Sequence, residues 1–96
     1  MKNTNPLEKE IESKVCAYAK SLGVLTYKFT SPARRSVPDR LFISKTGKVF
    51  WIEFKRLGCV PTPAQQVEID KLKAQQAEVY VVNQVEHGKN VVDCWA

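Results

Sequence analysis

The sequence has few of the residues that build zinc sites or disulfide frameworks. It contains one histidine, His87, and three cysteines, Cys16, Cys59 and Cys94, an odd number spread far apart along the chain. Because no C-x-x-C pair occurs, we expect neither bound zinc nor disulfide bonds. The cysteines are therefore interpreted as small apolar fillers in a protein kept in a reducing compartment, and His87 as a residue of a surface loop.

Long hydrophobic runs are also absent. No apolar stretch approaches the roughly 20 residues that a transmembrane helix needs, and the start, Met1-Lys2-Asn3-Thr4-Asn5, lacks the apolar centre of a signal peptide. We therefore expect a cytoplasmic protein with no membrane partner. The chain has 96 residues, 44% of them hydrophobic and 26% charged, which predicts one soluble globular domain over residues 1–96.

The first helix is expected to begin with Asn5 as N-cap, Pro6 at the first helical position and Glu8 at the capping-box position. Gly23 ends it, because glycine readily adopts the left-handed conformation that follows a helix. Apolar residues recur at spacings of three and four and predict one buried stripe. Its members are Leu7, Ile11, Val15, Tyr18 and Leu22.

A second helix is expected from Thr62-Pro63-Ala64-Gln65, which repeats the same start signals, to about Ala77, with Ile69 and Leu72 facing inward. Residues rich in β-branched and aromatic side chains predict strands. These strands cover residues 24–29, 40–44, 49–54 and 78–82, and after a turn at 85–88 residues 90–95 can add an edge strand.

The second and third strands are joined by a short polar loop that contains Gly47, which predicts a β-hairpin. Side chains alternate along a strand, so Glu53 and Lys55 point to one face, and the hairpin pairing brings Asp39 to their end of the sheet. Two neighbouring carboxylates repel each other unless a cation lies between them, and their oxygens suit Mg²⁺ or Mn²⁺.

Such an ion produces a hydroxide that attacks phosphorus, and a lysine beside it orients the water or stabilises the developing charge. The alternative is a surface hairpin in which Asp39 caps a turn and Glu53 and Lys55 form a solvated pair.

Basic residues surround this acidic pair. Residues 28–56 contain eight lysines and arginines against two acidic residues, a local net charge of +6, so the remainder of the chain, whose total is +5, sums to −1. Cations that hold phosphates around carboxylates that hold a metal suit a site acting on DNA, although ordinary solvation of a loop gives the same pattern. Our candidates for DNA contacts are Lys28, Arg34, Arg35, Arg40 and Arg56.

These residues carry a family resemblance. Pro38-Asp39 followed by Glu53-Phe54-Lys55 resembles the PD-(D/E)XK nuclease signature. A wider pattern, from roughly Leu7 to Val82, resembles the VRR-NUC branch of that superfamily, and in particular its small stand-alone versions from bacteriophages. It comprises Tyr27-Lys28-Phe29, residues 35–41, residues 49–55 and residues 61–65. One departure is Ser36, where the family usually has glycine, and a serine there changes the turn that leads to Asp39.

The resemblance implies an α/β protein with a restriction-endonuclease-like α-β-β-β-α-β core, in which helices flank a small mixed sheet. It implies an endodeoxyribonuclease that depends on Mg²⁺ or Mn²⁺ and cuts branched DNA such as Holliday junctions or flaps, in the host cytoplasm if the gene belongs to a phage. A four-way junction has two symmetric strands to cut and this chain offers one site, so we expect a homodimer.

The resemblance also assigns roles to residues. Asp39, Glu53 and the Phe54 backbone carbonyl would bind the metal, and Lys55 would orient the water. Glu12 on the first helix would complete the metal site, with Glu8 as its competitor for this role. Gln65 matches a glutamine that the family places near the active site, although the capping box explains it equally well.

Two other functions remain open. One is a non-catalytic DNA-binding module of the same fold. Binding of Mg²⁺ or Mn²⁺ that depends on Asp39 and Glu53 would exclude this alternative. The other is a nuclease with little structure preference, acting on linear duplexes or single strands, and a panel of DNA substrates separates it from a junction enzyme.

Overall fold

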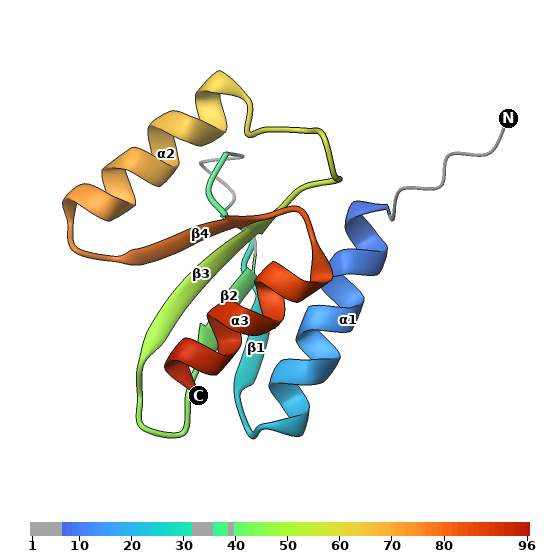
Figure 1. The fold of residues 1–96 in the computed structure, drawn as a ribbon. Helices are drawn as coiled ribbons and strands as arrows, with labels where there is room; N and C mark the ends of the chain where they lie inside the picture. Colours follow the sequence, from blue (N-terminus) through green and yellow to red (C-terminus); the bar gives the residue numbers. More distant parts are fainter. Residues whose placement is uncertain (1–6, 32–35, 39) are drawn as a thin grey trace, which may run out of the picture.

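The computed structural model describes residues 7–31, 36–38 and 40–96. Three helices and four strands follow one another along these residues (Figure 1). The first six elements have the order expected from the sequence, and a third helix follows them. They are α1 (Glu8–Ser21), β1 (Leu25–Lys28), β2 (Arg40–Ile43), β3 (Val49–Phe54), α2 (Pro63–Ala74), β4 (Glu78–Val82) and α3 (Val85–Trp95).

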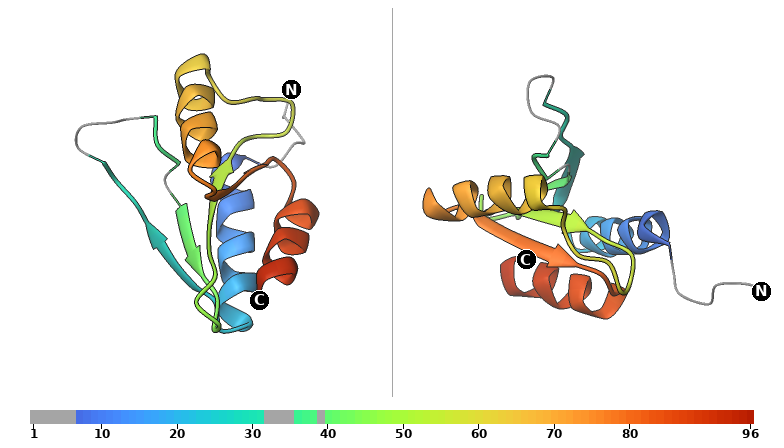
Figure 2. Two further views of the ribbon diagram at one scale, coloured as in Figure 1. Left: turned by 90° about the vertical axis from the view of Figure 1, so that its left-hand side faces the viewer. Right: turned by 90° about the horizontal axis from the view of Figure 1, so that it is seen from above.

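The four strands form one mixed sheet in the order β1-β2-β3-β4, in which the first three are antiparallel and β4 runs parallel to β3. The predicted hairpin is confirmed, and its register pairs Arg40 with Ile52. Helices α1 and α3 pack together on one face of the sheet, and α2 lies on the other face beside β4 (Figures 1 and 2). The sheet is therefore a layer between two helical layers, although the second layer holds only α2.

The main core lies between the sheet and the α1–α3 layer. Alternate residues of β3, namely Phe50, Ile52 and Phe54, are buried there as expected, and the Phe50 ring stacks on Phe42 with centroids 5.0 Å apart. The α1 contribution is Ile11, Val15 and Ala19, spaced four residues apart. This cluster fixes α1 against the strands that carry the candidate site.

The start of α1 differs from the expectation. Leu7 is the N-cap residue, with extended backbone angles and no side-chain cap, so the helix begins at Glu8, and Glu8 is not at a capping-box position. Asn5 and Pro6 lie outside the described residues. Because Leu7 precedes the helix, it does not continue the apolar stripe and is 49% exposed. The predicted end of α1 is confirmed, since Gly23 follows the helix with a φ of 78°.

The C-terminal prediction was wrong, because residues 85–95 form α3 instead of a turn and an edge strand. The β-branched pair at 91 and 92 favoured a strand, but Gly88, Val91 and Val92 share one helical face and are buried against α1. Gly88 makes this close approach possible, because a Cβ at this position would overlap the Val15 side chain. His87 is exposed as expected, but on a helix and not in a loop.

Further details correct the cysteine and helix predictions. All three cysteines are free, but only Cys16 is partly buried, so the filler interpretation is wrong for Cys59 and Cys94. Helix α2 ends at Ala74, three residues earlier than expected, because Gln76 adopts a positive φ of 68°. In the described part of the chain, every helix is too short or too polar to cross a membrane.

Candidate active site

Glu53 lies near the end of β3, on the face of the sheet that α2 shares. It is 6% exposed and is the only charged side chain that is buried among the described residues. Its neighbours in the strand point into the core on the opposite face, so strand alternation directs Glu53 away from the core. A buried carboxylate is energetically costly unless polar or charged groups surround it.

Two of those groups come from the predicted site. The Lys55 Nζ lies 3.7 Å from Glu53 Oε2, and the Lys55 side chain is only 13% exposed. The Gln65 Nε2 donates a hydrogen bond of 3.3 Å to the same oxygen. The structure therefore brings Glu53, Lys55 and Gln65 together, as the sequence predicted, at the point where the hairpin and the start of α2 meet.

The capping box explains how Gln65 is oriented. The Thr62 N–H donates to Gln65 Oε1 at 2.9 Å, and the Gln65 N–H donates to Thr62 Oγ1 at 3.2 Å. With its oxygen held by the helix start, the amide presents its NH₂ group to Glu53. The two sequence interpretations of Gln65 are therefore compatible, because one side chain makes both sets of contacts.

The donor atoms suit a hard divalent cation. Carboxylate and backbone carbonyl oxygens are the ligands that Mg²⁺ and Mn²⁺ prefer. The candidate set combines Glu53 with the Phe54 carbonyl and with Asp39, which lies outside the described residues. Within the described ranges no three side chains of histidine, cysteine, aspartate or glutamate form a metal-binding group.

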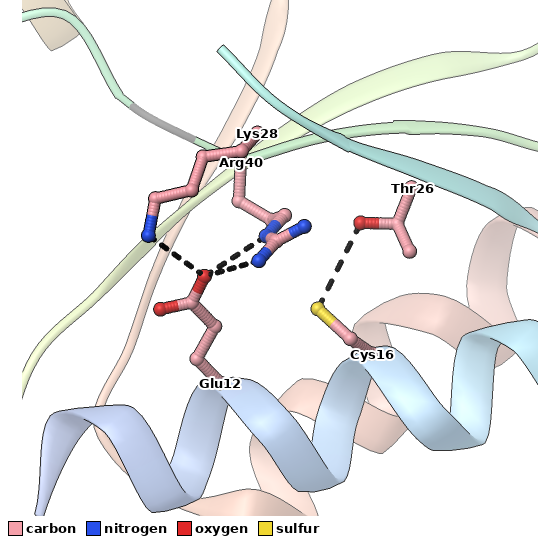
Figure 3. Close-up of polar contacts among 5 residues, drawn as sticks. All are labelled: Glu12, Cys16, Thr26, Lys28 and Arg40. Carbon is pink, nitrogen blue, oxygen red and sulfur yellow. Dashed lines mark hydrogen bonds and ion pairs between the residues drawn. The ribbon is translucent and has the colours of Figure 1, made fainter. Parts of the chain in front are cut away.

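Glu12 occupies a different environment (Figure 3). Its Oε2 accepts hydrogen bonds from Arg40 Nε at 2.9 Å and from Arg40 Nη2 at 2.7 Å, and Lys28 Nζ lies 3.9 Å from the same oxygen. Arg40 and Lys28 are paired residues of β2 and β1, so both point to the α1 face of the sheet. Glu8, the competing candidate, is exposed at the start of α1.

The remaining predicted residues are distributed as follows. Arg34 and Arg35 lie outside the described residues. Arg56 is half-buried directly after Lys55, and Ser36 is half-buried in a turn. The partnership of Arg40 with Glu12 was not anticipated. Its signal in the sequence is a basic residue immediately after Asp39 and an acidic residue at the border of the first apolar stripe.

An open cavity of about 310 Å³ lies beside this ion pair on the α1 face. The Cys16 Sγ on its wall is 3.7 Å from Thr26 Oγ1 of β1, so a second polar contact joins α1 to the sheet (Figure 3). Burial raises the pKa of the Cys16 thiol, and the Thr26 hydroxyl and the charge of Arg40 offset this only in part. The lining residues are Lys9, Glu12, Ser13, Cys16, Lys28 and Arg40.

The opposite face of the sheet is apolar, and the helices of the described residues leave much of it uncovered. Thr26 and Lys28 contact α1, so the alternate residues of β1 point away from it. Leu25 is 54% exposed and Val49 is 48% exposed, and α2 packs on β4 beyond them. We call the following set the apolar sheet face: Leu25, Tyr27, Phe29, Leu41, Ile43, Val49 and Trp51.

No family model matches the chain. Over 76 residues the chain is 40% identical to "Putative nuclease p44" of Acyrthosiphon pisum secondary endosymbiont phage 1, and the match covers 79% of this chain and 82% of that protein. The fold is similar to a solved structure described as "VRR_NUC domain", with a TM-score of 0.84 and 23% identity over 93% of this chain and 97% of the other. This likeness confirms the expected restriction-endonuclease-like α/β core. The chain therefore belongs to the family of the phage protein p44 and has the fold of a VRR-NUC domain, as its sequence motifs indicated.

Proposed function

We propose that this protein is a Mg²⁺- or Mn²⁺-dependent endonuclease that hydrolyses phosphodiester bonds in DNA. The main supporting observation is the buried Glu53 carboxylate, which contacts a lysine and a glutamine amide at the end of the hairpin. The name of the phage relative, a nuclease, points to the same chemistry.

Asp39 and Glu53, with the Phe54 carbonyl, would hold the metal. Asp39 lies between the buried Pro38 and Arg40, and Arg40 pairs with Ile52, the residue before Glu53. Arg40, the residue after Asp39 in the sequence, therefore belongs to the strand beside the one that carries Glu53. A bound divalent ion supplies Lewis acidity and lowers the pKa of a coordinated water.

The protein residues would then act on the water and the phosphate. Lys55 orients the attacking water and stabilises the negative charge that develops on the phosphate oxygens. The Gln65 amide, already fixed by the capping box, bonds the same water or a phosphate oxygen. The water oxygen bonds to phosphorus and loses a proton, the bond from phosphorus to the leaving sugar oxygen breaks, and that oxygen takes up a proton.

The basic residues would hold the DNA backbone around this site. Arg56, directly after Lys55, belongs to the described part of this zone, and Arg34 and Arg35 complete it, whereas Lys28 and Arg40 lie on the α1 face and contact Glu12. Contacts to phosphates position a duplex without reading its sequence. The family resemblance supports branched DNA as the preferred substrate, such as Holliday junctions or flaps.

A cleavage panel tests this proposal. The wild-type protein is incubated with a four-way junction, a flap, a linear duplex and a single strand, each with Mg²⁺ and with Mn²⁺. Asp39→Ala, Glu53→Gln and Lys55→Ala should each lose cleavage while still binding DNA, and calorimetry should show loss of metal binding for the first two. Asp70→Asn, an exposed change on α2, is the control.

The panel also separates the alternatives. DNA binding without cleavage, together with absence of metal binding, would identify a non-catalytic module. Equal cleavage of all four substrates would identify a nuclease with little structure preference.

The proposed functional unit is a homodimer joined through the apolar sheet face. Contiguous exposed apolar patches of this kind mark interaction surfaces. An exposed apolar patch can pack against its own copy about a two-fold axis, and sheets pack face to face about 10 Å apart. Trp51 belongs to this patch and lies two residues before Glu53 on the same face of β3, so the patch extends towards the candidate site. Two subunits would then present two sites to a branched DNA.

A further inference from the structure

The Glu12 carboxylate is already engaged by two cations. Arg40 directs two N–H groups of its rigid guanidinium at one oxygen, Oε2, and Lys28 lies within ion-pair distance of it. The side chains of Glu12 and Arg40 are only 12% and 20% exposed, so water screens their interaction weakly. A divalent ion that binds Glu12 Oε2 would have to approach Arg40 and Lys28, two positive groups that already contact this oxygen.

Glu12 and Glu53 also belong to different sides of the sheet. The partners of Glu12 lie on the face that carries α1 (Figure 3). Glu53 instead contacts Gln65 at the start of α2, the helix on the other face of the sheet (Figure 2). Strand alternation gives the same result, because Arg40 is paired with Ile52 of the α1-side core and Glu53 is the next residue along β3.

We propose that Glu12 is a positioning residue and not a metal ligand: it holds Arg40, the first residue of β2, against α1. Arg40 directly follows Asp39 in the sequence, and Asp39 is one of the two carboxylates that the proposed function assigns to the metal. The proposal rests on the proposed nuclease function, since it assigns Glu12 a task in support of the same metal site.

The remaining contacts fit this task. Ile11, next to Glu12, is fully buried in the core, so the carboxylate extends from a helix that is itself fixed. Cys16, one turn further along α1, contacts Thr26 of β1. Both polar contacts connect the same side of α1 to the sheet, and only the Glu12 contact reaches the strand that follows Asp39 (Figure 3).

A charge exchange distinguishes the two roles of Glu12. The variants are Glu12→Gln, Arg40→Glu and the double variant E12R/R40E, in which the two charges change places. Glu53→Gln serves as a reference for loss of a metal ligand, and Glu10→Gln, an exposed change on α1, is the control. Each variant is measured for Mg²⁺ and Mn²⁺ affinity by calorimetry, for kcat and KM on the preferred DNA, and for thermal unfolding.

If Glu12 positions Arg40, Glu12→Gln should lower kcat by about 10–100-fold while the metal Kd changes by less than about threefold. The double variant should recover much of the lost kcat, because the ion pair is restored with reversed charges, and it should unfold at a higher temperature than either single variant. A metal ligand cannot be replaced by arginine, so a ligand role predicts no recovery.

The inference is overturned if Glu12→Gln weakens metal binding as strongly as Glu53→Gln, or if E12R/R40E is no more active than the single variants. The proposed function fails in a different way, through a wild-type protein that neither binds the metals nor cleaves DNA. In that case the unfolding temperatures still test the pairing of Glu12 with Arg40. If E12R/R40E unfolds at no higher temperature than the single variants, the pairing is contradicted.

Discussion

The side chain of Gln65 connects the start of α2 to the candidate active site. Its oxygen completes the capping box with Thr62, and its nitrogen donates to Glu53. Either contact alone would explain why a glutamine stands at this position. Together they show that a residue that begins a helix can also orient a buried carboxylate.

Two alanine variants separate these contacts. Thr62→Ala removes the acceptor of the residue-65 N–H, and Gln65→Ala removes the other side of the capping box together with the contact with Glu53. Each should cost about 1 kcal/mol of unfolding free energy, measured by urea denaturation. Only Gln65→Ala should also lower the cleavage rate, by about tenfold, because only it changes the surroundings of Glu53. Equal cleavage rates in the two variants would show that Gln65 acts solely as a cap.

The cysteines allow a prediction on reactivity. Burial raises the pKa of the Cys16 thiol, and the thiolate is the reactive form. In variants that keep a single cysteine, Cys16 should react with iodoacetamide at least about tenfold more slowly than the exposed Cys59 near neutral pH. Mass spectrometry of the alkylated protein measures this. Equal rates would mean that the pocket beside Glu12 is open enough to solvate the thiolate.

The raised pKa of the Cys16 thiol also makes the stability of the folded protein depend on pH. A raised pKa means that the folded protein holds the thiol proton more tightly than the unfolded chain does. The contribution is therefore complete below the pKa of the unfolded thiol, and it is lost as the pH rises through the higher pKa of the folded protein. Replacement of Cys16 by serine should remove this alkaline part of the stability profile.

At the level of single residues, the sequence predicted which side chains gather but not what each one contacts. Alternation in β3 placed Glu53 and Lys55 on one face, and the family resemblance added Gln65 to them. The engagement of Glu12 by Arg40 depends on how far α1 lies from β2, and no local pattern encodes that distance.

Among the elements, α3 depends most on one small residue. Gly88 packs against Val15 of α1, and a Cβ there would overlap the Val15 methyl groups. Glycine in a helix interior normally costs about 1 kcal/mol relative to alanine, so Gly88→Ala would stabilise an exposed helix. Here the overlap should reverse the sign and destabilise the protein by about 1–3 kcal/mol.

Thermal unfolding measures this effect, and a loss of 1 kcal/mol corresponds to a fall of about 4–8 °C in Tm for a domain of this size. Asn90→Ala, on the exposed side of α3, is the control and should leave Tm unchanged or slightly higher. The double variant V15A/G88A should be more stable than the sum of its single variants, because the added methyl group enters the space that the valine leaves. A Gly88→Ala variant as stable as the wild type would mean that α1 and α3 can move apart at little cost.

The helix and strand types could be predicted wherever a local signal was strong. The hairpin, the start of α2 and the glycine that ends α1 each follow from residues close together in the sequence. The prediction failed for α3, because two adjacent valines favour strands locally while their burial against α1 favours a helix. Tertiary packing decided the outcome there, and it could not be read from the segment itself.

For the molecule as a whole, the family motifs predicted the α/β core, and the fold match confirms it. They did not show that α2 would pack on β4 and leave the rest of its sheet face uncovered. The uncovered area depends on the position of a single helix relative to four strands. Only the three-dimensional arrangement shows that six apolar side chains of three different strands, together with Phe29 directly after β1, join into one patch.

The role of that patch can be tested with two matched substitutions. Val49→Asp places a charge in the apolar sheet face, whereas Val60→Asp places the same charge on an exposed loop residue outside it. If two copies pack through this face, the wild type and Val60→Asp should be dimers by light scattering. Val49→Asp should be a monomer, because the two-fold axis brings both new carboxylates into one desolvated interface.

The monomeric variant should still cut a flap, which needs one site, but it should lose paired cuts on a four-way junction. A monomeric wild type would contradict the dimer. Loss of DNA binding in Val49→Asp without a change in molecular mass would instead assign the face to the substrate, since the aromatic rings of Tyr27, Phe29 and Trp51 can stack on unpaired bases.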